Sequence, residues 1–340
     1  MSVVVPSRGS GSGCPLSRSL LSAHIATSAL LLALMSPAAF AGTSLAAANA
    51  DLQAGKADEA LALLGDALKS DPNNGEADNL LCRVQYTLQQ FDQAAGNCEK
   101  AVRVNPQSAR YHLWLGRAIG ERASRASFMS AFSLAKKTRE EFEVAVRLDG
   151  QDADALSDLG EFYKEAPGIV GGGVDKANDV AKKLDAVDAS RAHQLRAEIA
   201  EKANDLDTAE KEFKAACTGS RVAIQWMELA SFYRRHERWS DMDAAVKSGE
   251  AAASRGKQAV AFFNGASTLA RANRQPDLAI HLYESYLASP EKSEEAPAFE
   301  ALIRLAKLRK LTGDQAGAQR EKAAALALAR EYKPAQDLKL

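Results

Sequence analysis

Residues 55–74, GKADEALALLGDALKSDPNN, and residues 89–106, QQFDQAAGNCEKAVRVNP, are two copies of one pattern. Three landmarks recur at a spacing of 34 residues, namely Ala60 and Ala94, Ala67 and Ala101, and Pro72 and Pro106. Coincident landmarks at one period indicate an internal repeat, and a period of about 20 to 50 residues is typical of solenoids and related arrays.

The composition favours helices. The 340 residues include 10 prolines, and few segments alternate β-branched residues as strands do. Ala, Leu, Glu, Lys, Arg and Gln are abundant, and these residues have high helix propensity. We therefore expect an all-α fold. The 43 basic and 44 acidic residues nearly balance, which gives no indication of a nucleic-acid partner.

The repeated residues resemble the tetratricopeptide repeat, a unit of two antiparallel helices with small residues at positions 8, 20 and 27. This frame, carried along the chain, gives eight candidate units that start near residues 41, 75, 109, 153, 190, 223, 260 and 299. The first helix of the sixth unit follows the family pattern most clearly, with Trp226, Leu229, Ala230 and Tyr233.

The resemblance implies an α-solenoid of about eight antiparallel hairpins over residues 42–340. Small residues let the two helices of a unit approach closely, and bulky residues fill the space between units. One hairpin cannot bury its own apolar face, so neighbouring hairpins must stack. The expected result is a right-handed superhelix whose concave surface is lined by the first helix of each unit.

The first 41 residues have the pattern of a secretory signal peptide. Arg8 and Arg18 precede the apolar run LLSAHIATSALLLALM at residues 20–35, and residues 39–41, Ala-Phe-Ala, match a signal-peptidase site. We expect cleavage after Ala41 and a periplasmic or secreted protein with no membrane insertion. The alternative is an uncleaved anchor, because residues 20–41 are just long enough to span a bilayer.

Two segments depart from the repeat. Residues 121–137 form an insertion of about ten residues that contains Phe128, Met129 and Phe132. It is either a lengthened hairpin, in which Phe128 and Phe132 cover the neighbouring unit, or a protruding element that docks a partner. Residues 166–173, APGIVGGG, are expected to form a wide turn after the helix that Pro167 ends. A glycine-rich anion site is the alternative, but the segment lacks the phosphate-loop pattern.

Two cysteines occupy facing positions in the repeat frame. Cys82 is at position 8 and Cys98 at position 24 of the second unit, which places them at the same height on the two helices of one hairpin. Because an exported protein meets an oxidising compartment, we predict a disulfide between them. The alternative is a pair of buried thiols that serve as packing residues.

No residue pattern indicates catalysis. The histidines of the predicted mature chain lack a Ser, Cys or carboxylate at a spacing that suggests a nucleophile, and the cysteines lack zinc spacing. We therefore expect neither an enzyme nor a metal site, and no cofactor.

The frame also predicts a partner-binding groove, because positions 2, 5, 9, 12 and 13 face the concave surface in this family. The residues proposed to bind a partner are Asn79, Arg83, Tyr86, Arg110, Arg117, Gln194, Arg234, Arg235, Asn264 and Arg271. Acidic residues share these positions, including Glu76, Asp154, Glu161, Glu198 and Glu201. Arginine and amide donors favour a protein or peptide partner that carries carboxylates. Ordinary solvated helix faces are the alternative.

The sequence therefore predicts an exported tetratricopeptide-type scaffold that mediates protein–protein interactions in the cell envelope. A membrane-anchored assembly factor with an uncleaved N-terminal helix is the alternative.

Overall fold

A computed structural model describes residues 37–340, apart from residues 220 and 257, with side chains described from Ser44 onward. Residues 1–36, with most of the predicted signal segment, lie outside this description. The described helices are α1 Pro37–Ala54, α2 Ala57–Ser70, α3 Gly75–Thr87, α4 Phe91–Val104, α5 Ala109–Arg125, α6 Phe128–Leu148, α7 Ala153–Glu165, η1 Gly168–Val170, α8 Val174–Asp185, α9 Ala189–Lys202, α10 Leu206–Ala216, α11 Val222–Arg235, α12 Trp239–Gly256, α13 Val260–Arg271, α14 Pro276–Ala288, α15 Ala298–Leu311, α16 Gln315–Leu328 and α17 Lys333–Gln336.

Helices α1 to α16 pack as eight successive hairpins, and the predicted fold class is confirmed. From the second unit onward, each odd-numbered helix begins within one residue of the predicted start of its unit. Side-chain caps explain several of these starts. Asn74, Ser108 and Asp152 each precede such a helix and accept hydrogen bonds from its first N–H groups.

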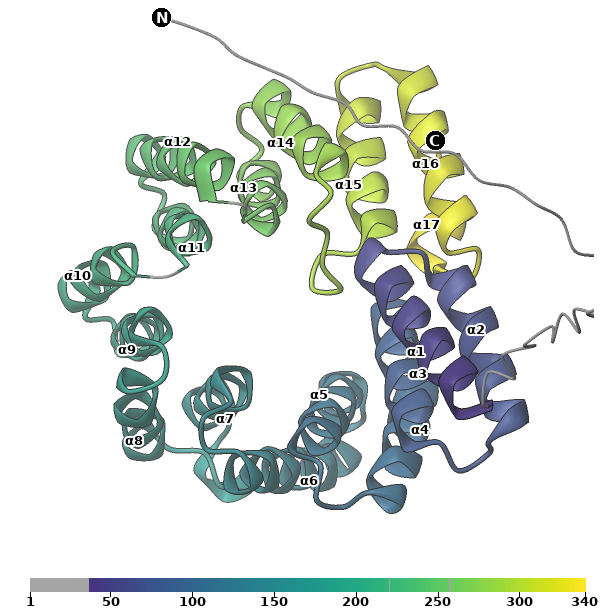
Figure 1. The fold of residues 1–340 in the computed structure, drawn as a ribbon. Coiled ribbons are helices and arrows are strands. Elements are labelled where there is room, and N and C mark those ends of the chain that lie inside the picture. The colour runs from purple at the N-terminus through teal and green to yellow at the C-terminus, as the bar shows by residue number, and fades with distance from the viewer. Residues whose placement is uncertain (1–36, 220, 257) are drawn as a thin grey trace, which may run out of the picture. The chain divides into compact units, whose positions relative to one another are not determined.

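The odd-numbered helices face inward, and their even-numbered partners lie outside them (Figure 1). Consecutive inner helices also contact one another, as α3 does α5, α7 does α9 and α11 does α13. Small residues of the repeat allow the inner and outer helices to pack closely. A Cβ atom on Gly116 of α5 would lie 2.5 Å from the Phe142 ring of α6, so only glycine fits there.

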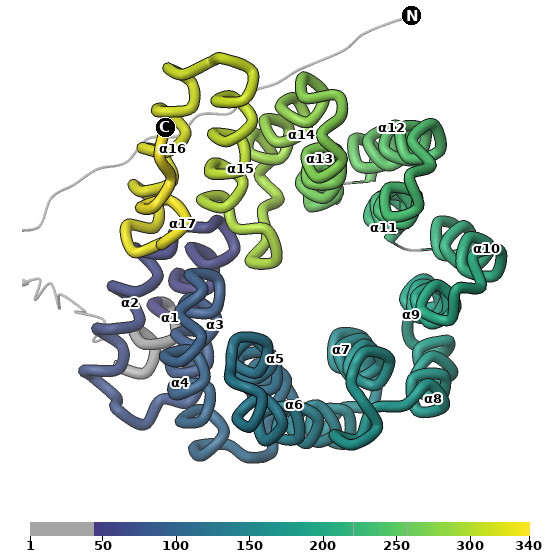
Figure 2. The backbone as a smooth tube through the Cα atoms, turned by 180° about the vertical axis from the view of Figure 1, so that it is seen from behind, coloured from purple at the N-terminus to yellow at the C-terminus, as the bar shows by residue number. Residues whose placement is uncertain are grey.

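The two ends of the array meet, so that the hairpins follow one another around a ring (Figures 1 and 2). Helix α2 contacts α16, and one apolar cluster contains residues from both ends of the chain. Its members include Leu52, Leu64, Leu80, Phe299, Ile303 and Tyr332. The predicted superhelix did not include this closure.

Gly55, between α1 and α2, makes part of the closure possible. Its φ is +74°, a conformation that side chains disfavour, and a Cβ atom there would lie 2.5 Å from the backbone nitrogen of Ala298. Nearby, the Arg330 guanidinium forms an ion pair with Asp58 at 3.1 Å. The contact between the ends thus combines apolar burial, close backbone approach and charge pairing.

The 121–137 insertion lengthens the third hairpin, as one of the two expectations held. It extends α5 to Arg125 and begins α6 at Phe128. The expectation that Phe128 covers the neighbouring unit is wrong, because the Phe128 side chain is 84% exposed and Met129 is 79% exposed. Leu134, one and a half turns later, packs against the apolar cluster of the second and third units.

Residues 166–173 form a wide turn that includes the short helix η1. Gly171 has a φ of +96°, and a side chain there would collide with Arg139. The Arg139 guanidinium donates to the carbonyl of Val170 at 3.2 Å, which ties the turn to α6. Among the described residues, no helix has the length and hydropathy needed to cross a bilayer.

Candidate partner-binding site on the inner face

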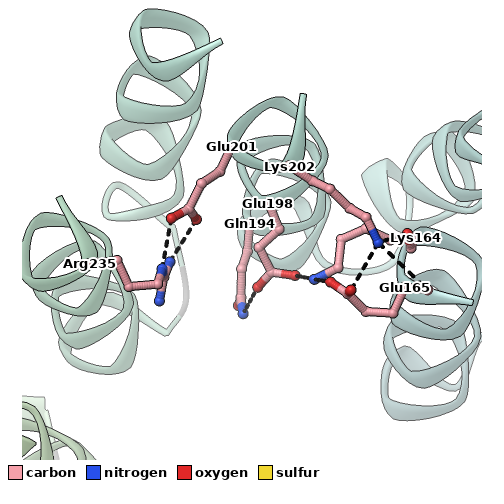
Figure 3. A network of polar contacts seen from close by, with 7 residues as sticks. All are labelled: Lys164, Glu165, Gln194, Glu198, Glu201, Lys202 and Arg235. Carbon is pink, nitrogen blue, oxygen red and sulfur yellow. Dashed lines mark hydrogen bonds and ion pairs between the residues drawn. The ribbon is translucent and has the colours of Figure 1, made fainter. Parts of the chain in front are cut away.

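Polar side chains connect successive inner helices (Figure 3). Lys164 on α7 forms an ion pair with Glu198 on α9 at 2.6 Å, and Gln194 donates to the same carboxylate at 2.9 Å. Further along, Arg235 on α11 donates two hydrogen bonds of 2.7 Å each to Glu201 on α9. The inner face is therefore held by charge pairs between neighbouring units.

Several predicted groove residues belong to such pairs. Arg110 pairs with Glu76, and Arg117 donates from Nε to Asp158 at 2.5 Å. Burial lowers the pKa of Arg117, but Asp158 outweighs it and leaves that pKa raised. These guanidinium groups neutralise carboxylates of the chain itself, so they are not free to hold a partner's carboxylate.

Two predicted groove residues are buried, which corrects their assignment to an open groove. Asn79 is 0% exposed, and neither atom of its amide group has a hydrogen-bond partner in the described part of the chain. Arg83 is 7% exposed because the connector between α14 and α15 covers it. Its guanidinium donates from Nη2 to Glu294 at 2.6 Å.

The predicted groove residues Arg234 and Arg271 lie near each other, and their binding role stays a prediction. They are on the adjacent inner helices α11 and α13, one turn beyond the Ser231 and Thr268 hydroxyls, which lie 2.9 Å apart. No acidic side chain of the described residues forms an ion pair with either arginine. Burial and the neighbouring charges of Arg235 and Arg271 lower the pKa of Arg234. Asn264, one helical turn before Thr268, is half-buried.

A cavity of about 780 Å³ opens between α3, α5, α7 and the α14–α15 connector. Its apolar wall is aromatic and includes Tyr86, Phe91, Trp114 and Phe162. The ring of Tyr86 packs edge-on against Phe91 and Trp114, with centroids 5.3 and 5.5 Å away. Tyr86 was predicted to face the groove, whereas the other three were not, because aromatic side chains at helical spacing are indistinguishable from core residues in the sequence.

Seven carboxylates also line this cavity, together with Arg117 and Arg125. They belong to Glu121, Asp158, Glu161, Glu165, Glu294, Glu295 and Glu300. Five of the seven carboxylates pair with cations of the chain. The carboxylates of Glu161 and Glu295 have no partner in the described part of the chain, and both side chains are exposed. Displacement of water by the surrounding wall, and then the charge of Glu198, raise the pKa of Glu161.

The structure joins the two predicted cysteines. Cys82 on α3 and Cys98 on α4 form a disulfide with their Cα atoms 5.3 Å apart, and both residues are fully buried. The bridge holds the two helices of the second hairpin together behind the aromatic wall. Among the described residues, no group of three His, Cys, Asp or Glu side chains is placed to hold a metal ion.

Residues 51–118 match the tetratricopeptide repeat family. They cover α2, α3 and α4 with parts of α1 and α5, and therefore include both copies of the repeated pattern. No curated protein matches the chain.

Several solved structures resemble this one. A thermophilic tetratricopeptide repeat protein of Thermus thermophilus is 22% identical, with 52% of this chain and 90% of that chain covered and a TM-score of 0.45. A tetratricopeptide repeat protein from Parabacteroides merdae is 11% identical, with 87% and 99% covered and a TM-score of 0.42. The human IFIT1 dimer with PPP-AAAA is 17% identical, with 81% and 69% covered and a TM-score of 0.43.

All three TM-scores are below 0.5, so nothing about the partners of this chain follows from these similarities. Tetratricopeptide repeats typically bind proteins and lack catalytic activity. Residues 51–118 therefore match the tetratricopeptide repeat family, and helices α1 to α16 pack as successive hairpins of the tetratricopeptide type.

Proposed function

We propose that this protein is an exported scaffold that binds a segment of a partner protein on its inner face, in the cavity lined by α3, α5 and α7. The observation that supports this most is an aromatic wall next to the exposed carboxylates of Glu161 and Glu295, which have no partner among the described residues. A cleft with apolar walls and a few polar groups is the common form of a ligand site.

The charge of the cavity favours a segment with a basic side chain. A lysine or arginine next to Glu161 would pair with a carboxylate that has no partner in the described chain. Its positive charge would also offset the repulsion between Glu161 and Glu198, which raises the pKa of Glu161. This differs from the carboxylate-bearing partner that the sequence suggested, since Arg110, Arg117 and Arg235 are engaged in ion pairs.

The carboxylate hypothesis remains a second candidate at one place. Arg234 and Arg271 lie at equivalent positions of adjacent inner helices and form no ion pair within the described residues. Each repels the other, which contributes to the lowered pKa of Arg234. A carboxylate of a partner would relieve this repulsion and accept charge-assisted hydrogen bonds from both side chains.

Export is proposed from the signal pattern of the first 41 residues, and the Cys82–Cys98 disulfide supports it because disulfides persist in oxidising compartments. Cleavage after Ala41 would remove the first residues of α1 but retain Ala48, the first buried residue among the side chains of α1 that the structure describes. Sequencing the N-terminus of the protein purified from its native source tests this: Gly42 is expected, and an intact N-terminus would favour the membrane-anchored assembly factor.

The site is tested by a photo-crosslinking amino acid placed at Ser124, which lines the cavity and is exposed. Lys247 on the outer helix α12 provides a matched control position. We expect a partner segment with a basic residue to crosslink at position 124, and the product to be lost when Glu161 is changed to Lys.

Crosslinking of equal strength at both positions would contradict the cavity as the site. A product at position 124 that persists in Glu161→Lys but disappears when Arg234 and Arg271 are both changed to Glu would favour the second candidate. Identification of the crosslinked segment by mass spectrometry then shows which charge it carries.

A further inference from the structure

The connector between α14 and α15, residues 289–297, is unlike the others. It has nine residues, whereas the connectors between the other hairpins have three to five. In both views of the backbone it extends inward, toward α1 at the opposite end of the chain (Figures 1 and 2). Its sequence, SPEKSEEAP, is rich in charge and carries three glutamates.

Glu294 of this connector is held by side chains of the first two units. Arg83 on α3 donates from Nε at 3.0 Å and from Nη2 at 2.6 Å to the two carboxylate oxygens of Glu294. Gln53 on α1 donates to the same carboxylate at 3.0 Å. Only 8% of the Arg83 side chain and 12% of the Glu294 side chain are exposed.

The main chain of Glu294 is bound as well as its side chain. The side-chain oxygen of Gln53 accepts a hydrogen bond from the Glu294 N–H at 3.3 Å. Asn49, one turn before Gln53, accepts from Arg83 Nη2 at 3.3 Å and so fixes the guanidinium. Gln53 therefore contacts both the main chain and the carboxylate of Glu294.

The connector is shaped by contacts of its own. The Tyr286 hydroxyl donates to the carbonyl of Ala296 at 2.5 Å and accepts from the N–H of Ser293 at 3.2 Å. The neighbouring Glu295 is exposed, and its carboxylate has no partner in the described residues. One glutamate is thus presented to the inner helices, and the next one to solvent.

We propose that Gln53 and Arg83, oriented by Asn49, form a peptide-binding site for a glutamate in an extended acidic segment, and that Glu294 of the chain itself fills this site. An acidic segment of a partner protein exchanges with the connector there. Because Glu294 and Glu295 also line the cavity described above, such an exchange would change the wall of that cavity. This site binds an acidic side chain, whereas the cavity favours a basic one. The proposal for this site does not depend on the proposal for the cavity.

The test uses a fluorescent synthetic peptide with the sequence of residues 289–297 and the full-length protein. In one variant, residues 291–295 are replaced by glycine and serine, and circular dichroism verifies that the helices are retained. We expect this variant to bind the peptide at least tenfold more tightly than the wild type does. Adding Arg83→Ala to the variant should abolish binding.

Two altered peptides give the specificity. A peptide with Ala at the position of Glu294 should not bind, whereas a peptide with Ala at the position of Glu295 should bind as the original does. Equal binding of both peptides, or no binding to a folded variant, would overturn the proposal. The contact of Glu294 with Gln53 and Arg83 would then only join the two ends of the ring.

A second measurement uses the wild type, in which the connector is unchanged. We expect saturating peptide to increase hydrogen exchange of residues 289–297, and the peptide with Ala at the position of Glu294 to leave it unchanged. Unchanged exchange with both peptides would overturn the proposal. The two proposals can fail separately. Absence of crosslinking at Ser124 with normal peptide exchange would contradict the cavity proposal alone. Normal crosslinking without peptide exchange would contradict this proposal alone.

Discussion

Arg83 on α3 and Glu294 in the α14–α15 connector are 211 residues apart in the chain, yet two hydrogen bonds join their side chains. Both are largely buried, so the pair is withdrawn from solvent where the ends of the array meet. This pair is one of the interactions that join the two ends of the ring, and the pattern of a single repeat does not predict it.

Replacing Arg83 by Ala should destabilise the protein by about 3 kcal/mol, because it leaves the buried Glu294 carboxylate without its main partner. Arg110→Ala is the matched control, since Arg110 also pairs with a glutamate of another unit but its side chain is 52% exposed. That change should cost less than about 1 kcal/mol. Urea unfolding followed by circular dichroism measures both, and equal costs would contradict the importance of the closing pair.

Reduction of the Cys82–Cys98 disulfide should lower the stability of the second hairpin by about 3 kcal/mol, since the bridge closes a short loop. Mass spectrometry without reduction should find this bridge and a free thiol at Cys217. Reductant should lower the melting temperature of the wild type and leave a variant with Ala at positions 82 and 98 unaffected. Free thiols at both positions in the native protein would refute the bridge.

Stability should depend on pH through Glu228, which lies on α11 and has no hydrogen-bond or ion-pair partner in the described part of the chain. Burial, and then the charge of Glu198, raise the pKa of Glu228 from 4.5 to about 7. The folded protein therefore binds this proton more tightly than the unfolded chain does, and stability falls as the pH rises from about 4.5 to about 7.

Glu228→Gln removes this effect, because glutamine stays neutral. The variant should be more stable than the wild type by about 1 to 3 kcal/mol at a pH of about 8 and nearly equal to it at a pH of about 4.5. Urea unfolding at the two pH values measures the difference. A difference that does not change with pH would show that Glu228 titrates normally.

Gly116→Ala should destabilise the protein by about 1 to 3 kcal/mol, since the added Cβ atom would lie 2.5 Å from the Phe142 ring. Gly65→Ala on α2 is the control, because nothing lies within 4 Å of a Cβ atom at that position. That change should stabilise the helix by about 1 kcal/mol through helix propensity. Thermal unfolding of both variants would reveal opposite shifts, and shifts of the same sign would contradict the packing described here.

Periodicity made the hairpins predictable. Ala60, Ala94 and their equivalents recur because each unit makes the same contacts, so the helix boundaries follow from the sequence. Some charge pairs follow the same rule. Glu76 and Arg110, like Glu201 and Arg235, are 34 residues apart and pair across equivalent positions. This pairing of opposite charges was available in the sequence and would have shown that these arginines are engaged.

Closure was not predictable in this way. Glu294 lies in a connector outside the repeat frame, so its position bears no periodic relation to Arg83. The frame placed Asn79 and Arg83 on a concave surface, but it contains no information about a segment that covers that surface. The cavity was missed for a related reason, because Trp114 and Phe162 occupy positions where a core aromatic is equally expected.

The contact between the two ends is tested most directly by the distance between spin labels at Glu59→Cys and Glu331→Cys, in a variant whose free Cys217 is replaced by Ala. Glu59 is next to Asp58, and Glu331 is next to Arg330, and those two neighbours form the ion pair between α2 and the segment after α16. The closed ring predicts a single, narrow and short distance by pulsed electron paramagnetic resonance, which lengthens and broadens in urea. A long or broad distribution in the folded protein would contradict closure.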